Sequence, residues 1–259
     1  MSAQGNNSTA IDLYLNLLQK SLTSTLFDDE PDHDNTDGRA FVSQFAKHYI
    51  RGSAITMLPR VRLDNIRQCT EYVLQNNIPG DFLEAGVWRG GGCIFMSGCL
   101  RAFEIFNRRV WVADSFEGLP EPDATRTKEV EFHNSPLMQK IYGKMSASLQ
   151  EVQANFSAYG MLDNRVQFLR GWFKDTLPGA QFDRLALMRL DGDYYESTID
   201  ALGALYPRLS PGGIVIIDDY GEDLWTDCRQ AVEDFRSAND IGAELFRVDS
   251  KCVFWKKPL

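Results

Sequence analysis

The sequence lacks any hydrophobic run of the ~18 residues that a membrane-spanning helix requires. Residues 1–7 also lack the charged and apolar regions of a secretory signal peptide. Basic residues are too few to balance the acidic ones, since 27 Lys and Arg face 36 Asp and Glu and leave a net charge of −9. Nucleic-acid backbones are bound by clustered Lys and Arg, so this balance argues against a nucleic-acid partner. We therefore expect a cytoplasmic protein that has neither a membrane nor a nucleic acid as partner.

Cysteine and histidine are both sparse. The five cysteines are odd in number and form no C-x-x-C pair, which argues against a disulfide framework or a zinc site. We expect them to be buried thiols: Cys69, Cys93, Cys99, Cys228 and Cys252. The three histidines show no ligand spacing. His33 and His133 lie in polar segments, where we expect solvated side chains.

The 259 residues divide into a helical first third and a part in which strands and helices alternate. An amphipathic helix is expected at 8–26, followed by an acidic loop at 28–39 and a helical zone at 41–77 broken near Gly52 and Pro59. We take 1–78 as a helical extension that covers a pocket or a neighbouring subunit, and 79–259 as the main domain. Within the main domain, strands are expected at 81–87, 110–113, 166–169, 185–190, 213–217, 244–248 and 252–255, and helices at 90–106, 146–162, 195–209 and 223–239.

Strands alternating with helices are typical of an α/β fold, with a doubly wound, mostly parallel sheet. The last two strands suggest a closing hairpin with one antiparallel strand. The stretch 117–145 is polar and interrupted by prolines, unlike an element of the core.

Acidic residues follow two apolar runs of the main domain. Asp191 and Asp193 come after 185–190, and Asp218 and Asp219 come after 214–217. In an open α/β sheet, ligands gather at the carboxyl ends of the strands, so these acids should share one crevice. Helix capping and turn formation are the alternative explanation. Four neighbouring carboxylates repel one another unless a cation or proton intervenes, and an all-oxygen cluster suits Mg²⁺.

A glycine-rich turn at 84–92 connects a strand to a helix. Glycine lets the backbone turn tightly near a ligand, and the helix N-terminus offers free N–H groups. Trp88 stands where G-x-G-x-x-G has its middle glycine, which would obstruct a dinucleotide pyrophosphate but hinder S-adenosylmethionine less. Asp114, at the end of the next strand, is the acid expected to bind ribose hydroxyls. A plain turn at 84–92, and an Asp114 that caps a turn with Ser115, are the alternatives.

An aromatic pair, Trp172 and Phe173, follows Gly171 after the third strand. Such a pair could sandwich an adenine ring, and it could equally belong to the core. The sequence leaves both interpretations open.

At these residues the chain resembles the macrocin O-methyltransferase family of antibiotic biosynthesis, the TylF, MycF and NovP group. The resemblance covers nearly the whole chain. The matching stretches are 55–57, 62–65, 80–91, 112–118, 171–176, 188–193, 210–213 and 215–220.

The resemblance implies a class I methyltransferase (Rossmann-like) fold. It also implies transfer of a methyl group from S-adenosylmethionine to a deoxysugar hydroxyl of a glycosylated natural product, of macrolide or aminocoumarin type, with Mg²⁺. The implied metal ligands are Asp191, Asp218 and Asp219. Asp193 matches the general base, a role that Asp191 could share. The cofactor-binding set is Thr56, Met57, Glu84, Ala85, Gly86, Trp88, Asp114, Ser115, Gly171, Trp172, Phe173 and Asp191. The stretch 117–145 matches the family's lid region poorly.

A sugar hydroxyl is a poor nucleophile, so coordination to Mg²⁺ and a nearby carboxylate base would both assist the transfer. One rival is a nicotinamide-dependent oxidoreductase, against which stand the missing middle glycine and the absence of a Tyr-x-x-x-Lys pair near the sheet. Another is a noncatalytic scaffold subunit, against which stand the intact Asp191, Asp218 and Asp219. The apolar face of the first helix suggests a homo-oligomer, a dimer or larger.

Overall fold

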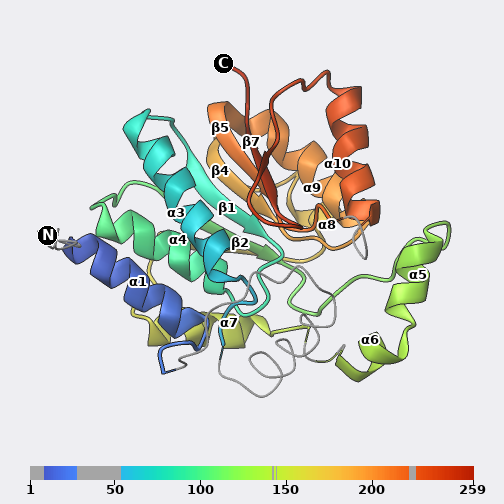
Figure 1. Cartoon of the computed structure of the whole chain (residues 1–259), viewed down its shortest axis with the longest axis horizontal. Helices are drawn as coiled ribbons and strands as arrows, with labels where there is room; N and C mark the ends of the chain where they lie inside the picture. Colours follow the sequence, from blue (N-terminus) through green and yellow to red (C-terminus); the bar gives the residue numbers. More distant parts are fainter. Residues whose placement is uncertain (1–8, 28–53, 142, 144, 222–225) are drawn as a thin grey trace, which may run out of the picture.

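The computed structural model describes residues 9–27, 54–141, 143, 145–221 and 226–259 (Figure 1). Its centre is a seven-stranded sheet in the order β3-β2-β1-β4-β5-β7-β6. The strands are β1 Asp81–Ala85, β2 Val110–Asp114, β3 Val166–Arg170, β4 Leu185–Leu190, β5 Leu209–Ile217, β6 Phe246–Arg247 and β7 Val253–Lys256. Strands β3, β2, β1, β4 and β5 pair in parallel, and β7 pairs antiparallel with both β5 and β6. The expected mostly parallel α/β sheet with one antiparallel closing strand is confirmed.

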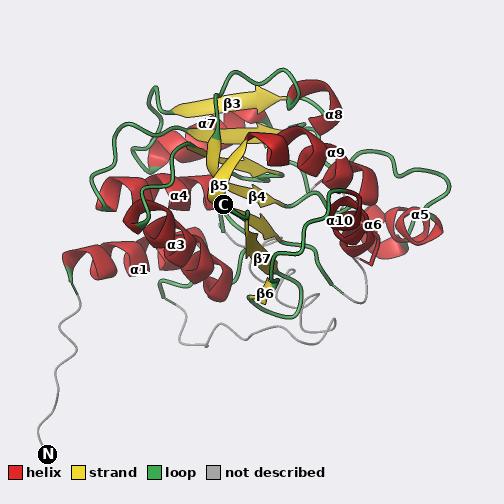
Figure 2. Ribbon diagram, turned by 90° about the horizontal axis from the view of Figure 1, so that it is seen from above, coloured by secondary structure: helices red, strands yellow, loops and turns green. Residues whose placement is uncertain are grey.

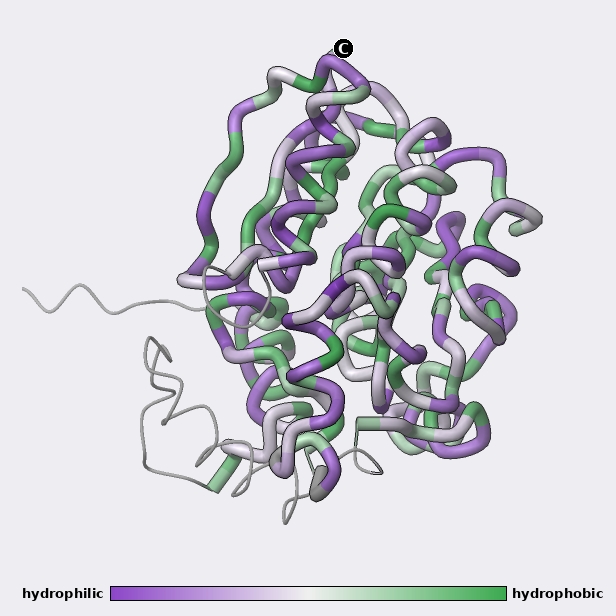
Figure 3. Tube along the Cα trace, turned by 90° about the vertical axis from the view of Figure 1, so that its right-hand side faces the viewer, coloured by the Kyte–Doolittle hydropathy of each residue, from purple (hydrophilic) through white to green (hydrophobic). Residues whose placement is uncertain are grey.

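Helices cover both faces of the sheet (Figure 2). They are α1 Ala10–Leu22, α3 Arg60–Gln75, α4 Gly91–Ala102, α5 Thr127–His133, α6 Pro136–Ile141, α7 Leu149–Ala158, α8 Phe173–Thr176, α9 Tyr195–Leu205 and α10 Thr226–Ala238, with a 3₁₀ turn, η3, at Tyr206–Arg208. Hydrophobic and hydrophilic residues alternate along the helical turns, as expected of helices with one face on a core (Figure 3).

Two hydrophobic clusters fill the space between the sheet and its helices. Because successive strand residues point to opposite faces, Phe82 belongs to the cluster that includes residues of α1, α3, α4 and α7, whereas Leu83 belongs to the cluster that includes residues of α9 and α10. Trp111 joins the second cluster, with its ring edge-on to Phe182 at 5.3 Å. The sheet is thus buried on both sides, which leaves its edges and strand ends for function.

The two described helices of the N-terminal extension pack into the first cluster. Helix α1 begins at a capping box, in which the Thr9 side chain accepts from the Asp12 amide and the Asp12 carboxylate accepts from the Thr9 amide. Its buried face, Leu15, Leu18 and Leu22, packs on α4. Helix α3 packs on α4 and on the ends of β4 and β5. The acidic loop at 28–39, the start of the zone at 41–77 and His33 lie outside the described residues.

The structure differs from expectation in several elements and at one histidine. The polar stretch 117–145 contains two short helices, α5 and α6. Strand β5 begins four residues before the expected start at 213, and α9 ends at Leu205 because Pro207 enters the 3₁₀ turn and cannot donate to a helical ladder. The prediction of a solvated His133 is wrong, since His133 is buried against Tyr194. All five cysteines are buried and free, as expected. No helix among the described residues is long and apolar enough to cross a membrane.

Candidate active site

A cavity of about 540 Å³ opens at the carboxyl ends of β1, β2 and β4. It brings together nine residues that sequence reasoning proposed: Met57, Gly86, Trp88, Asp114, Ser115, Trp172, Phe173, Asp191 and Asp193. Six other proposed residues lie beside the cavity without lining it: Thr56, Glu84, Ala85, Gly171, Asp218 and Asp219. The cavity therefore joins the expected cofactor side of the crevice to part of the acidic cluster.

The turn after β1 requires glycine at position 86. Gly86 has a φ of +86°, and a Cβ there would lie 1.8 Å from the Asp191 carbonyl oxygen. Its amide donates to the Ala113 carbonyl at 2.9 Å. No other residue could bring the β1 turn so close to the end of β4. The wall of the cavity is formed at this close approach.

Asp114, at the end of β2, organises the same turn. Its carboxylate accepts from the Val87 amide and from the Phe116 amide, each at 2.8 Å. Burial raises the pKa of Asp114, although these amides act in the opposite direction. The Ser115 hydroxyl donates to the Gly118 carbonyl at 2.9 Å. The turn-capping interpretation therefore describes real contacts, and Asp114 lines the cavity as well.

The segment before α3 lies against the start of α4. The Gly91 amide donates to the Ile55 carbonyl at 3.1 Å, and the Thr56 hydroxyl accepts from the Leu58 amide at 3.1 Å. This backbone contact holds Met57 at the cavity. The buried Thr56 side chain stabilises the segment through its hydrogen bond with the Leu58 amide. Trp88, with a φ of +47°, lines the cavity under the Arg89 guanidinium, which lies 4.4 Å from its ring centroid.

The aromatic pair after β3 lies at the cavity, and one of its two rings also contacts the core. Trp172 precedes the short helix α8, and Trp172 and Phe173 both line the cavity. Phe173 also packs against the second hydrophobic cluster. The pair can therefore face a planar ligand ring while it is anchored in the core.

Three carboxylates gather at the ends of β4 and β5. One oxygen of each of Asp191, Asp193 and Asp219 lies within 4.8 Å of the others. The Asp193 amide donates to Asp219 Oδ2 at 3.2 Å, and Asp193 has a φ of +59°. Non-glycine residues rarely adopt this conformation, and it is often found at functional sites.

The electrostatics of this cluster favour an added positive charge. Burial, followed by the charges of Asp193, Asp191 and Asp218, raises the pKa of Asp219 well above its ordinary value. Burial and the charge of Asp218 likewise raise the pKa of Asp191. Like charges that face one another cannot all stay ionised without a counter-ion, so the cluster takes up a proton or a cation.

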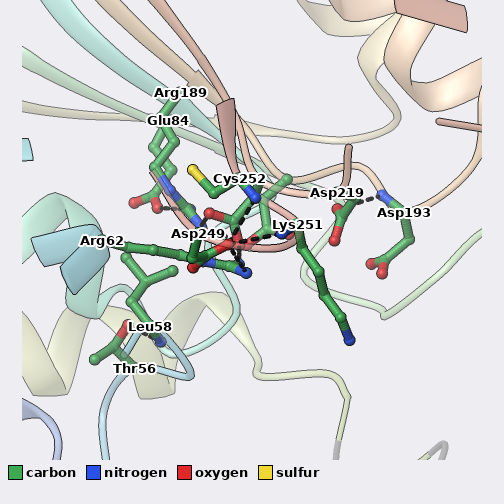
Figure 4. A network of polar contacts seen from close by, with 12 residues as sticks. Thr56, Leu58, Arg62, Glu84, Arg189, Asp193, Asp219, Asp249, Lys251 and Cys252 are labelled. Carbon is green, nitrogen blue, oxygen red and sulfur yellow. Dashed lines mark hydrogen bonds and ion pairs between the residues drawn. The ribbon is translucent and has the colours of Figure 1, made fainter. Parts of the chain in front are cut away.

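Asp218 is held differently from Asp193 and Asp219, because it pairs with Arg62 and Arg189. The two arginines are labelled in Figure 4. Asp218 Oδ1 lies 2.6 Å from the Arg189 guanidinium and its Oδ2 lies 2.5 Å from that of Arg62. Burial alone would raise the pKa of Asp218, but the two arginines hold it below its usual value. Arg62 in turn forms a two-pronged ion pair with Asp249, whose Nε–Oδ2 distance is 2.6 Å and Nη2–Oδ1 distance is 3.1 Å. The protein's own cations therefore neutralise the carboxylate of Asp218.

Arg189 is the residue that sequence reasoning missed most clearly. It is buried, pairs with Glu84 and lies 3.0 Å from Asp191. Glu84 and Arg189 stand opposite each other in the β1–β4 register. Two opposite charges in neighbouring, otherwise apolar strands were the available signal. Glu84 therefore holds Arg189 beside the acidic cluster and does not line the cavity.

The sheet order, the antiparallel β7 and the cavity at the strand ends define a class I S-adenosylmethionine-dependent methyltransferase. Comparisons with known proteins narrow this class. The family model for the macrocin O-methyltransferases (TylF) matches residues 48–257. The chain belongs to this family and is an O-methyltransferase.

Several relatives match over nearly their whole lengths. The chain is 48% identical over 261 residues to 8-demethyl-8-(2,3-dimethoxy-alpha-L-rhamnosyl)-tetracenomycin-C 4'-O-methyltransferase of Streptomyces olivaceus, with 95% of this chain and 93% of the relative covered. It is 41% identical over 257 residues to mycinamicin III 3''-O-methyltransferase of Micromonospora griseorubida, with 96% and 98% covered. The solved structure of the O-methyltransferase NovP superposes with a TM-score of 0.82 at 42% identity, with 96% and 100% covered. These matches do not support the oxidoreductase alternative.

Proposed function

We propose that the chain is a Mg²⁺-dependent S-adenosylmethionine:sugar O-methyltransferase that methylates a deoxysugar hydroxyl of a glycosylated natural product in antibiotic biosynthesis. The observation that carries this proposal is a single cavity lined by Asp114, Trp172, Asp191 and Asp193. This cavity combines polar and aromatic side chains, which suit S-adenosylmethionine, with carboxylates. The relatives named for rhamnosyl-tetracenomycin and mycinamicin support a glycosylated small molecule as the acceptor class.

The cofactor would lie along the Gly86 turn. Asp114 and Ser115 would bind its ribose, and the Trp172–Phe173 pair would face its adenine ring. Trp88 and Met57 would close the methionine side. Thr56, Glu84, Ala85 and Gly171 would act on this pocket through the backbone segments that carry the lining residues. An in-line arrangement of the acceptor oxygen, methyl carbon and sulfur is the remaining requirement for transfer.

The acidic cluster fits a hard divalent cation, because it offers only oxygen atoms and because burial and neighbouring carboxylates raise the pKa values of Asp191 and Asp219. Asp191 and Asp219 would hold the ion, with Asp218 as the third ligand that the family resemblance implies. Asp218 would have to give up one arginine contact to take part. A bound Mg²⁺ would stabilise the developing alkoxide of the acceptor.

Asp193 would be the general base, with Asp191 able to share the role. Asp193 lines the cavity and its backbone is fixed against Asp219. A carboxylate in that place can accept the proton of a sugar hydroxyl that approaches the cofactor. The sugar hydroxyl is a weak acid, so its proton should leave as the oxygen–methyl bond forms.

The proposed function is tested by incubating the enzyme with S-adenosylmethionine, Mg²⁺ and a panel of deoxysugar glycosides. A product heavier by one methyl group, with the new methyl on a sugar oxygen, is expected for at least one member. Asp193→Asn should lower this turnover by at least a hundredfold. Methylation of the aglycone alone, or equal turnover by the variant, would contradict the assignment.

A further inference from the structure

Helix α5 is fastened to the start of α9 by polar contacts rather than by a hydrophobic core. Figures 1 and 2 show α5 and α6 at the margin of the molecule, beside α10. The Arg126 guanidinium lies 3.4 Å from the Tyr195 ring centroid, and Lys128 Nζ lies 3.3 Å from the Thr226 hydroxyl. His133 Nδ1 lies 3.0 Å from the Tyr194 hydroxyl. A helix held by such contacts can dock and undock at modest cost.

The central contact of this junction is made by Glu129. The N-cap residue of α9, Tyr194, supplies no capping side chain, so the first amides of α9 need acceptors from elsewhere. Glu129 Oε1 accepts from the Tyr195 amide at 2.7 Å. A side-chain oxygen from another helix can satisfy such an amide. Glu129 therefore caps α9 from a helix 66 residues earlier in the chain.

The turn that precedes α9 also carries two residues of the proposed site, Asp191 and Asp193. Residues 191–194 connect β4 to α9, and Asp193 adopts a left-handed conformation there. The Tyr194 amide donates to the Gly192 carbonyl at 2.6 Å, so the turn and the helix start form one unit. Tyr194 and Tyr195, the residues next to Asp193, are both held by α5. Docking of α5 thus fixes the position of Asp193.

We propose that Glu129 is a positioning residue that couples the docking of α5 to the geometry of the Asp191–Asp193 turn. The inference rests on the proposed function insofar as Asp193 is the base. Glu129 does not line the cavity, and its effect reaches the reaction only through Tyr195 and the turn.

The surroundings of Glu129 give this contact a pH dependence. Its Oε2 is buried and has no hydrogen-bond partner among the described residues. Glu196 of α9 and Asp227 of α10 add negative charge around it, and Arg126 adds positive charge. Burial is the largest cause that raises the pKa of Glu129, to about 7. A raised pKa means that protonation stabilises the docked state, so docking is strongest at low pH and weakens as pH rises through about 7.

The test compares Glu129→Ala and Glu129→Gln with Glu131→Ala, a control on the exposed side of the same helix. Hydrogen exchange of the Tyr195 amide is the first readout, because that amide has no acceptor within its own helix. Glu129→Ala should reduce the protection of this amide at least tenfold, whereas Glu129→Gln and Glu131→Ala should leave the protection unchanged. In wild type, α5 protection, corrected for intrinsic exchange, should fall about tenfold from pH 6 to pH 8, and in Glu129→Gln it should stay constant.

The second readout is turnover. Glu129→Ala should lower kcat at least tenfold while the Kd for S-adenosylmethionine changes less than twofold, and Glu129→Gln should restore kcat at pH 6. Unchanged Tyr195 exchange in Glu129→Ala would overturn the cap, and unchanged kcat would overturn the positioning role. If wild type transfers no methyl group to any glycoside, the proposed function fails, while the exchange experiment still decides whether Glu129 caps α9.

Discussion

At the scale of residues, the charge balance of the site depends on two arginines, the buried Arg189 and the mostly buried Arg62. Arg62 and Arg189 neutralise Asp218, and both are held in turn by further acids. Breaking a buried ion pair by removing one partner is costly, because the remaining charge stays buried. Arg189 also contacts Asp191, so the charge that no arginine contacts lies on Asp193 and Asp219, beside Asp191, where a cation can bind.

Arg62→Met should lower the free energy of unfolding by ~3 kcal/mol at pH 7.5, because Asp218 and Asp249 lose their shared partner. Arg60→Met, on the same helix turn, removes only a partly exposed pair with Asp64 and should cost less than ~0.5 kcal/mol. The arginines hold the pKa of Asp218 below 3.8, so their stabilisation is complete above that pH and is lost as pH falls through the lowered value. Urea unfolding at several pH values measures this. A difference between wild type and Arg62→Met that grows on acidification would contradict the assignment.

Sequence patterns found the residues whose place follows from a strand end. Asp114, Asp191 and Asp193 lie at the cavity because their strands are parallel neighbours. Contacts across long stretches of sequence left no such pattern. His133 meets Tyr194 and Glu129 meets Tyr195 only after the chain has folded, and no spacing predicts either contact.

At the scale of elements, the turn from β1 to α4 is the most constrained connection. Gly86→Ala should destabilise the protein by ~3 kcal/mol or more and weaken S-adenosylmethionine binding, since a Cβ would collide with the Asp191 carbonyl. Gly203→Ala is the matched control in α9, where a Cβ meets nothing within 4 Å. It should stabilise by about 0.5–1 kcal/mol, because alanine favours a helix. Thermal unfolding and calorimetry measure both effects. A fully stable Gly86→Ala variant would refute the close approach.

The stretch 117–145 should form a mobile cover over the cavity. Its flanks, from Gly118 to Asp123 and at Met145, line the cavity, and α5 docks through polar contacts. Closing a cover excludes water from the transfer step. Limited proteolysis should cleave this stretch at least tenfold more slowly when S-adenosylmethionine and a glycoside acceptor are both bound. Equal cleavage with and without ligands would contradict the prediction of a mobile cover.

The order of strands and helices could be predicted because hydrophobic runs of different lengths alternate along 79–259. The two helices inside 117–145 could not, because seven and six residues are too few to show a helical period. The tertiary contacts that hold α5 leave no pattern in the sequence. The early start of β5 was hidden by Pro211 and two glycines, which are typical of a turn. Leu209 nevertheless pairs with β4, and Gly212 and Gly213 exchange backbone hydrogen bonds with Lys257, just after β7.

At the scale of the whole molecule, α1 leaves apolar side chains on its outer face. Leu13 and Leu17 are 62% and 55% exposed and lie one helical turn apart. We infer that this face meets a second copy of the chain, giving a homo-oligomer of two or more subunits. Leu13→Glu combined with Leu17→Glu should then shift sedimentation to the monomer while the unfolding midpoint measured at low concentration changes little. Wild-type protein that sediments as a monomer would reject the inference.

The central claim is that the acidic cluster works through a bound divalent cation. The measurement is methyl transfer to a glycoside acceptor, followed by mass spectrometry, first in EDTA and then with Mg²⁺ restored. The account predicts that EDTA abolishes turnover and that Mg²⁺ restores it. Asp219→Asn should lower turnover by orders of magnitude. The variant should still bind S-adenosylmethionine, because Asp219 does not line the cavity. Full turnover in EDTA would contradict the account and leave Asp193 as a base that acts without a metal.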